Sequence, residues 1–206
     1  TGVQTCALPI SRTLHGQSEP EVTTHFTGCV RLVMSPYAAG KENNVPVPEA
    51  GPRAEASQIY RVFFHGPAYR VIESAWRSGD RVIGLYAKNL PPNHEPADLP
   101  LAASPRSVEM CFQSASLAGL ALQSRLGLPY AFRELQIAAQ PDAAQDADQF
   151  AVVTPHPDGS YDVKMVDSRG NVTMILRGYQ TMELPDPVQA DLLEPIQRGL
   201  RAEPQQ

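Results

Sequence analysis

The pattern of apolar and polar positions is most distinctive over residues 105–127, PRSVEMCFQSASLAGLALQSRLG, which has apolar residues on every side of a helical projection. A helix that is apolar all round is normally buried. Ser104 suits the N-cap, Pro105 the first helical position and Gly127 a left-handed C-cap. We therefore expect a long buried helix over 105–127.

Runs rich in β-branched and aromatic residues predict strands on both sides of this helix. Before it, residues 59–77 hold a short element, a His-Gly-Pro turn and a strand, and Gly79-Asp80 marks a hairpin turn. The expected strands cover 22–33, the end of 59–77, 81–90, 132–139, 148–155, 161–167 and 171–184. One buried helix among about six antiparallel strands predicts an α+β hotdog fold, in which the sheet wraps around the helix.

Prolines cluster at 36–52, 91–105 and 185–204, which predicts linkers at 35–57 and 186–206, the second with a short helix within 187–201. A net charge of −5 with 19% charged residues does not favour nucleic acid or an anionic membrane as partner. No apolar run reaches the roughly eighteen residues of a membrane span. The cysteines form no disulfide or metal pattern, so we expect a reducing, cytoplasmic environment and no metal.

The first ten residues, TGVQTCALPI, match the translation of a widely used short-read sequencing adapter at every position. We interpret 1–10 as an artefact and exclude it from fold reasoning. On this interpretation Cys6 is not a native cysteine, and the natural frame begins upstream of Ser11, so we expect a truncated protein.

Four segments, in this order, resemble the dehydratase domains of modular polyketide synthases and multifunctional fatty-acid synthases: FHGPAY (64–69), EMCFQ (109–113), LGLPYAFRELQI (126–137) and DSRGNVTMILRGYQTMEL (167–184). Together they match the family's Gly-Pro turn, its Asp-x-x-x-Gln/His helix motif, its Leu-Pro segment and its closing hairpin.

The resemblance implies a double hotdog with the first half truncated. Residues 11–34 would be the end of the first hotdog, with 22–33 as its last strand, and 58–185 would be the second hotdog.

The resemblance also implies the reaction: loss of water from a 3-hydroxyacyl thioester to give a 2-enoyl thioester. Glu109 stands at the family's Asp position, as the general acid, and Gln113 would orient it. Burial in an apolar pocket raises a carboxyl pKa, so we expect a raised pKa for Glu109. Gln113 lies one helical turn on, within reach of the carboxyl or the substrate hydroxyl.

The same resemblance indicates the substrate contacts and partners. The substrate-binding candidates are His65, Gly66, Pro67, Tyr69, Leu128 and Pro129. No cofactor is expected, because the acyl chain would arrive on the phosphopantetheine of an acyl carrier protein. That carrier and other synthase domains would be the partners, and a homodimer is compatible with this.

Two departures from the family pattern bear on activity. Glu109 is one methylene longer than Asp, and a misplacement of about 1 Å can cost on the order of a hundredfold in rate. The family's His-x3-Gly-x4-Pro base motif is absent, since His15 is not followed by it. We therefore expect this fragment to be inactive alone.

Other interpretations stay open from the sequence. Glu109 could merely favour the helix dipole with its carboxyl in solvent, leaving Gln113 exposed as well. The module could be non-catalytic, or bind and shape a polyketide intermediate as product-template relatives do. A stand-alone hotdog thioesterase fits less well, because residues 22–57 add a strand and a proline-rich segment.

Overall fold

The computed structural model describes residues 2–13, 15–16, 18–34, 37, 40–42, 45, 51–92, 95–96, 104–138, 147–185 and 187–201. Two units make up the chain, Thr1–Pro36 and Tyr37–Gln206. Within the described residues no helix is long and apolar enough to cross a membrane.

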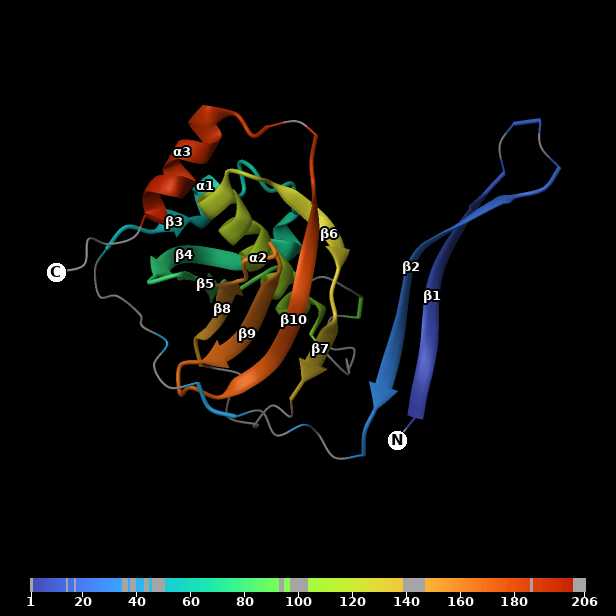
Figure 1. The fold of residues 1–206 in the computed structure, drawn as a ribbon, viewed down its shortest axis with the longest axis horizontal. Helices are drawn as coiled ribbons and strands as arrows, with labels where there is room; N and C mark the ends of the chain where they lie inside the picture. Colours follow the sequence, from blue (N-terminus) through green and yellow to red (C-terminus); the bar gives the residue numbers. More distant parts are fainter. Residues whose placement is uncertain are drawn as a thin grey trace. The chain divides into compact units, whose positions relative to one another are not determined.

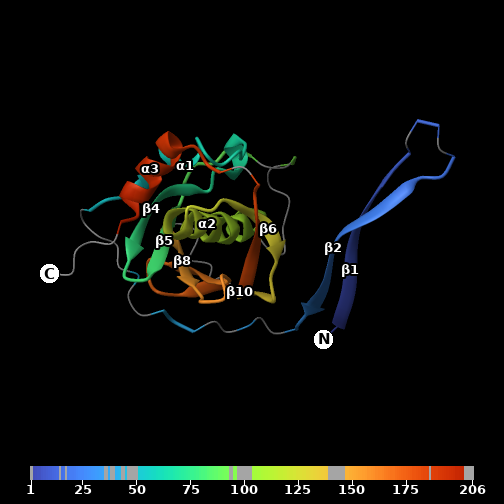
Figure 2. The ribbon, with the colours of Figure 1, turned by 45° about the horizontal axis from the view of Figure 1, so that its top comes forward.

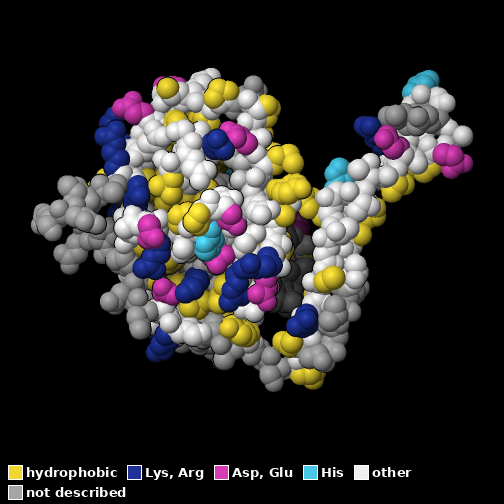
Figure 3. All heavy atoms as spheres, in the orientation of Figure 1, with side chains coloured by type: hydrophobic (Ala, Val, Ile, Leu, Met, Phe, Trp, Pro, Cys, Tyr) yellow, Lys and Arg dark blue, Asp and Glu magenta, His cyan; other side chains and the backbone are white. Residues whose placement is uncertain are grey.

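The first unit is a hairpin of β1 (Gly2–Arg12) and β2 (Glu21–Leu32), which confirms the strand predicted at 22–33. Every residue of β2 is exposed, and the apolar side chains along the hairpin lie open in Figure 3. A lone two-stranded hairpin has no core of its own.

The second unit is a sheet wrapped around one helix, α2 (Pro105–Gln123) (Figures 1 and 2). The sheet order is β3-β4-β5-β8-β9-β10-β6, β7 also pairs with β10, and all of these pairs are antiparallel. Helix α2 contacts β4, β5, β6, β8, β9 and β10. The strands are β3 (Ala54–Glu55), β4 (Ile72–Ser78), β5 (Arg81–Tyr86), β6 (Gly127–Ala131), β7 (Glu134–Ile137), β8 (Gln149–Pro155), β9 (Tyr161–Asp167) and β10 (Val172–Glu183). The predicted α+β hotdog fold is confirmed.

The N-terminus of α2 is as predicted and its C-terminus is not. The Ser104 hydroxyl accepts a hydrogen bond from the Ser107 amide at 3.3 Å, and Pro105 opens the helix. The helix ends with Ser124 in the left-handed region, φ 57°, three residues before the predicted Gly127. Gly127 instead opens β6, where a Cβ would lie 2.5 Å from the Thr181 side chain. Its lack of a side chain serves close strand packing and not a helix cap.

The buried character of α2 has a direct structural cause. Residues from Met110 to Leu120 are all buried except the half-buried Phe112. On β5, a Cβ at Gly84 would lie 2.8 Å from both Met110 and Ser114. The missing side chain at Gly84 lets the helix lie close to the sheet, so the apolar side chains of the helix are buried on all sides.

The segment predicted as a linker at 35–57 packs, where it is described, against the sheet face that points away from α2. Glu42 forms ion pairs with Arg81 at 3.2 Å and Lys164 at 2.6 Å. Val45 packs against the apolar side chains of that face, and the Arg53 guanidinium lies 4.9 Å from the Trp76 ring centroid. The described residues of this segment therefore lie on the second sheet face, and β3 and α1 (Ala56–Ile59) follow them. Across the visible face of this unit, charges of both signs are interspersed (Figure 3).

The C-terminal segment forms the short helix expected within 187–201, but this helix packs on the domain and does not extend as a linker. Residues 190–199 form α3 (Ala190–Gly199), which contacts α1, α2, β3 and β4. Ile196 and Leu200 are buried in the main core. A Cβ at Gly199 would overlap the backbone of Arg53 and Ala54, so glycine is required for this packing. The proline content suggested a linker, but the apolar residues of this segment complete the core.

Candidate active site

A cavity of about 50 Å³ lies beside the N-terminal half of α2. One wall consists of Glu109, Phe112, Gln113 and Ser116, which share a helix face by their spacing of three and four residues. The other walls come from residues 63–65, of which 64 and 65 belong to the predicted motif at 64–69, and from residues 126–129 of the predicted motif at 126–137. The fold thus brings three predicted motifs to one cavity. Its volume is small compared with the roughly 300 Å³ or more of a typical ligand pocket.

Glu109 is held in this wall by two side chains. Its Oε1 lies 3.0 Å from His65 Nε2 and accepts a hydrogen bond from Gln113 Nε2 at 3.1 Å. The side chain of Glu109 is 25% exposed, so one part of the carboxylate faces the cavity while Oε1 is held. The interpretation in which Glu109 and Gln113 both extend into solvent is wrong.

Gln113 is 2% exposed and every polar atom of its side chain is used. Its Oε1 accepts from the Tyr60 hydroxyl at 2.8 Å, and its Nε2 donates to the Tyr69 carbonyl at 2.8 Å as well as to Glu109. The Tyr60 oxygen in turn accepts from the Ile72 amide at 2.8 Å. Burial raises the pKa of Tyr60, so its hydroxyl keeps its proton and donates it to Gln113. Gln113 therefore orients Glu109, and its amide has no polar atom left for a substrate hydroxyl.

The pKa of Glu109 is not raised as the sequence analysis expected. Burial is the largest influence and raises it, but the hydrogen bonds from His65 and Gln113 and the charge of His65 together outweigh burial. The pKa of Glu109 is consequently lowered from its ordinary value, because N–H donors favour the ionised carboxylate. The sequence shows that the helix is buried but not which donors reach the carboxylate.

The ring of His65 is fixed by its neighbours. Phe64 stacks on it with ring centroids 5.4 Å apart, and Phe63 and Tyr60 approach in T-shaped contacts at 5.8 Å and 6.4 Å. The Arg70 Nε donates to the His65 carbonyl at 3.2 Å and stabilises the turn. The Nδ1 atom of His65 is buried and has no hydrogen-bond partner within the described part of the chain.

The six predicted substrate contacts divide into two groups. His65, Leu128 and Pro129 line the cavity. Gly66, Pro67 and Tyr69 do not: they form the short 3₁₀ turn, and a Cβ at Gly66 would meet nothing within 4 Å. These three residues shape the backbone on which His65 and the Tyr69 carbonyl are placed.

Sequence reasoning missed several residues of the site. Phe112 and Ser116 could have been found, because they lie on the Glu109 face at helical spacing. Tyr60 gave no local signal, since it lies 53 residues from its partner Gln113. Phe64 opens the predicted motif and Phe63 precedes it, but nothing in the sequence showed whether their side chains would line the cavity or lie in the core.

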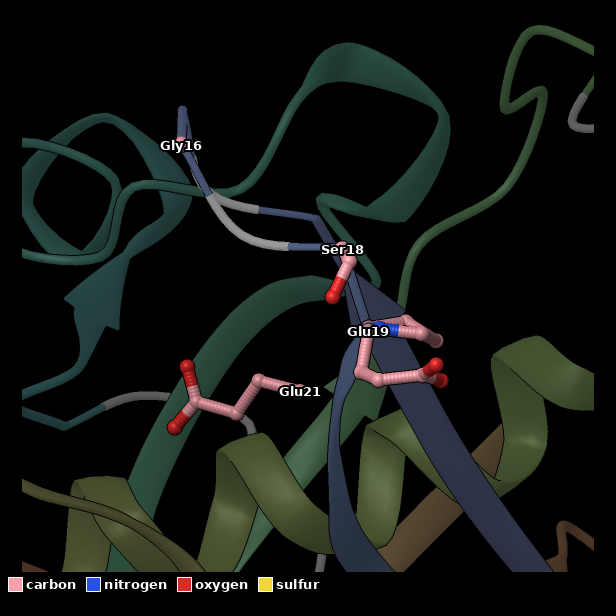
Figure 4. A pocket seen from close by; sticks show the side chains of 5 residues that line it. Gly16, Ser18, Glu19 and Glu21 are labelled. Carbon is pink, nitrogen blue, oxygen red and sulfur yellow. The ribbon is translucent and has the colours of Figure 1, made fainter.

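Other features of the described chain do not form a comparable site. A hollow in the hairpin loop is lined by Gly16, Ser18, Glu19, Pro20 and Glu21, with no wall from another element (Figure 4). No group of three His, Cys, Asp or Glu side chains that could hold a metal occurs among the described residues. Cys111 is buried, and burial raises the pKa of its thiol to about 12, so it is a packing residue.

Comparison with solved structures places this fold among dehydratase domains. A trans-AT polyketide synthase dehydratase domain from Brevibacillus brevis matches with a TM-score of 0.66 and 20% identity, covering 89% of this chain and 66% of that one. The dehydratase domain of the CurF module of curacin polyketide synthase matches with a TM-score of 0.63 and 18% identity, covering 88% of this chain and 69% of that one. A structure that gives insight into dehydratase substrate selection for the borrelidin and fluvirucin polyketide synthases matches with a TM-score of 0.62 and 18% identity. The match covers 91% of this chain and 63% of that one. This chain thus spans about two thirds of the length of these structures. The comparison with curated proteins finds no match.

A helix wrapped by an antiparallel sheet, with a hydrogen-bonded carboxylate at the wall of a cavity beside the helix, defines a hotdog protein with a candidate site on its central helix. The family model described as polyketide synthase dehydratase N-terminal domain matches residues 39–191. The chain belongs to the polyketide synthase dehydratase family.

Proposed function

We propose that this chain is the acid-bearing half of a dehydratase domain that removes water from a 3-hydroxyacyl thioester. The observation that carries the proposal is the Glu109 carboxylate at the cavity wall, held by His65 at 3.0 Å and Gln113 at 3.1 Å. Membership of the dehydratase family supports the reaction class.

The chemistry is a β-elimination. A base removes the α-proton, the electrons of that C–H bond form the new double bond, and the bond from C3 to the hydroxyl breaks. Glu109 gives a proton to the departing hydroxyl, which leaves as water. The base would be a histidine of the preceding half of the domain, as in the family that this chain resembles.

Glu109 must be protonated when the substrate is bound. The two N–H donors favour the ionised form, so the free site holds a carboxylate. An acyl chain filling the cavity beside Phe112 and Leu128 would remove water and favour the neutral acid. The proton is thus taken up on substrate binding and passed to the hydroxyl during elimination.

No cofactor is needed for this reaction. We expect the acyl chain on the phosphopantetheine of an acyl carrier protein, with other domains of a cytoplasmic synthase as further partners. The 50 Å³ cavity fits the reacting end of an acyl chain and not a whole one, which agrees with a site that a second half completes.

The test begins with the DNA upstream of Ser11. If it encodes a half with the His-x3-Gly-x4-Pro motif, the complete domain is assayed by mass spectrometry for loss of water from 3-hydroxyacyl pantetheine thioesters. The Glu109→Gln variant is the matched control, because it keeps the size of the side chain and removes the acid. We expect activity in the complete domain and a loss of about 100-fold or more in the variant.

Two results would contradict the proposal. One is an upstream half without that histidine. The other is a complete, folded domain that binds the thioester but leaves its hydroxyl in place, which would indicate a binding or product-shaping module.

A further inference from the structure

We propose that the hydroxyls of Ser116 and Tyr179 form a polar subsite at the end of the cavity away from Glu109, where they bind an oxygen that the acyl chain carries beyond its 3-hydroxyl. This deepens the proposed function and rests on it for the identity of the ligand. The subsite gives the domain a preference for an acyl chain with this further oxygen over a saturated chain of the same length.

The first observation is an unpaired hydroxyl in the core. Tyr179 on β10 is fully buried, and its hydroxyl has no hydrogen-bond partner among the described residues. The hydroxyl of Tyr60, by contrast, donates to Gln113 and accepts from the Ile72 amide. Burial raises the pKa of Tyr179, so its hydroxyl keeps its proton. Since buried polar groups are normally paired, Tyr179 holds an unused donor that a ligand oxygen can accept from.

The second observation is the place of this hydroxyl behind the cavity wall. Burial raises the pKa of Tyr179 and the Ser116 hydroxyl lowers it in part, so the two hydroxyls are close neighbours. Ser116 lines the cavity, and so does Phe112, whose ring lies parallel to that of Tyr179 with the centroids 5.0 Å apart. Tyr179 therefore lies directly behind the part of the wall that Phe112 and Ser116 form.

The third observation is the weak pairing of Ser116 itself. Its Oγ donates to the Gly127 carbonyl at 3.4 Å, which is long for a hydroxyl donor. A hydroxyl also has two acceptor lone pairs. Gly127 belongs to the same wall and has no side chain to fill this end of the cavity. An oxygen that enters here can thus contact both hydroxyls.

The separation from Glu109 decides which oxygen of the substrate the subsite takes. Glu109 and Ser116 both line the cavity and lie two turns apart on α2, which is about 10 Å along the helix axis. One substrate hydroxyl cannot contact both residues. The 3-hydroxyl belongs to Glu109 in the proposed function, so Ser116 and Tyr179 meet a later part of the chain. A saturated chain leaves Tyr179 unpaired, and such a site discriminates against a ligand that lacks the matching oxygen.

The state of the Tyr179 hydroxyl is tested in the chain itself by urea unfolding. Tyr179→Phe removes an unpaired hydroxyl, and the matched variant Tyr60→Phe removes one that makes two hydrogen bonds. We expect the midpoint of Tyr179→Phe to equal or exceed that of the native chain, and the midpoint of Tyr60→Phe to fall. A fall in both variants would overturn the proposal, because the Tyr179 hydroxyl would then already be bonded.

The ligand preference is tested by calorimetric titration of the complete domain in its Glu109→Gln form, so that the probes are not dehydrated. The probes are 3-hydroxydodecanoyl pantetheine and analogues with one keto group at C5, C7, C9 or C11. We expect one keto position to bind roughly ten- to hundredfold more tightly than the saturated probe. Tyr179→Phe and Ser116→Ala should each remove most of this preference and change the affinity for the saturated probe by no more than a few-fold.

Equal affinity for all probes, or a preference that survives in either variant, would overturn the subsite. Circular dichroism shows whether each variant folds, and Ser116→Ala keeps the test valid if Tyr179→Phe does not. Binding is measured apart from dehydration. A domain that prefers one keto probe, but dehydrates none of the probes with Glu109 restored, would overturn the proposed function and leave the subsite standing.

Discussion

The Tyr60 hydroxyl donates a 2.8 Å hydrogen bond to the side-chain oxygen of Gln113, a residue 53 positions further along the chain. This bond decides which end of the Gln113 amide faces Glu109. With Oε1 bound to Tyr60, the NH₂ group must point to the carboxylate and to the Tyr69 carbonyl. Tyr60, the residue directly after α1, thus sets which groups donate to the Glu109 carboxylate.

The first prediction concerns the stability of this connection. Tyr60→Phe removes the hydroxyl that accepts from the Ile72 amide, and Gln113→Leu removes the acceptor of the Tyr60 hydroxyl and the donor to the Tyr69 carbonyl. We expect losses of about 1–3 kcal/mol for the first and about 2–4 kcal/mol for the second, by urea unfolding.

The double variant should lose less than the sum of the two, by about 1 kcal/mol, because both remove the same bond. Gln197→Leu, which removes only an exposed bond to Ser124, is the control and should stay within about 0.5 kcal/mol. Strict additivity of the two single variants would show that the bond contributes nothing.

The second prediction concerns the length of the acid. Glu109→Asp draws the carboxylate back toward the helix and away from His65 Nε2, now at 3.0 Å. We expect kcat of the complete domain to fall by about a hundredfold, the cost of a misplacement near 1 Å. The comparison is with Glu73→Asp, an exposed position on β4. An unchanged kcat would mean that the contact with His65 does not place the acid.

The third prediction concerns pH. The pKa of Glu109 is lowered in the folded chain: burial raises it, and the donors from His65 and Gln113 outweigh burial. A lowered pKa stabilises the fold above the ordinary value of 4.5, and this contribution is lost as the pH falls through the folded pKa.

The measurement is the free energy of unfolding of the native chain minus that of Glu109→Gln, from neutral pH downward. We expect this difference to shrink in acid. The subtraction removes the contributions of Glu42 and Asp167, whose pKa values are also lowered. A difference that grows in acid would mean that burial dominates and that the resting acid is neutral.

The fourth prediction tests whether α3 belongs to the domain. In Gly199→Ala the new methyl group would overlap the backbone of Arg53 and Ala54. We expect a loss of about 1–3 kcal/mol, typical of overpacking in a well-packed contact. Arg198→Ala, next to it with a side chain 66% exposed, should change stability by no more than about 0.5 kcal/mol. Equal effects of the two would indicate a loosely attached tail.

The fifth prediction uses the thiols. Cys6 and Cys29 are exposed, whereas Cys111 is buried with its pKa raised by burial to about 12. In the native chain a thiol reagent should modify the first two quickly and Cys111 only after unfolding. Peptide mapping by mass spectrometry reports the modified sites. Rapid native labelling of Cys111 would contradict the buried position of α2.

The sequence by itself determined the elements that depend on neighbouring residues. The apolar run with its Ser104 cap specified a buried helix, and runs rich in β-branched and aromatic residues specified β8, β9 and β10 nearly to the residue. The spacing of four residues placed Glu109 and Gln113 on one face, because a helix repeats every 3.6 residues. The hotdog arrangement followed, since such a helix has to be covered on all sides.

Tertiary structure decided everything that depends on distant partners. Helix α2 ends at Ser124 and not at Gly127, and Gly127 lies in close contact with the Thr181 side chain across the sheet. The two proline-rich segments that flank the sheet pack on the domain, because Val45 and Ile196 meet apolar surfaces that only the folded sheet presents. The pKa of Glu109 fell because a turn from another segment carries His65 to within 3.0 Å of it. A hydrogen bond forms between atoms about 3 Å apart in space. When its two residues are far apart in the sequence, as His65 and Glu109 are, the pattern of neighbouring residues does not show that they will meet.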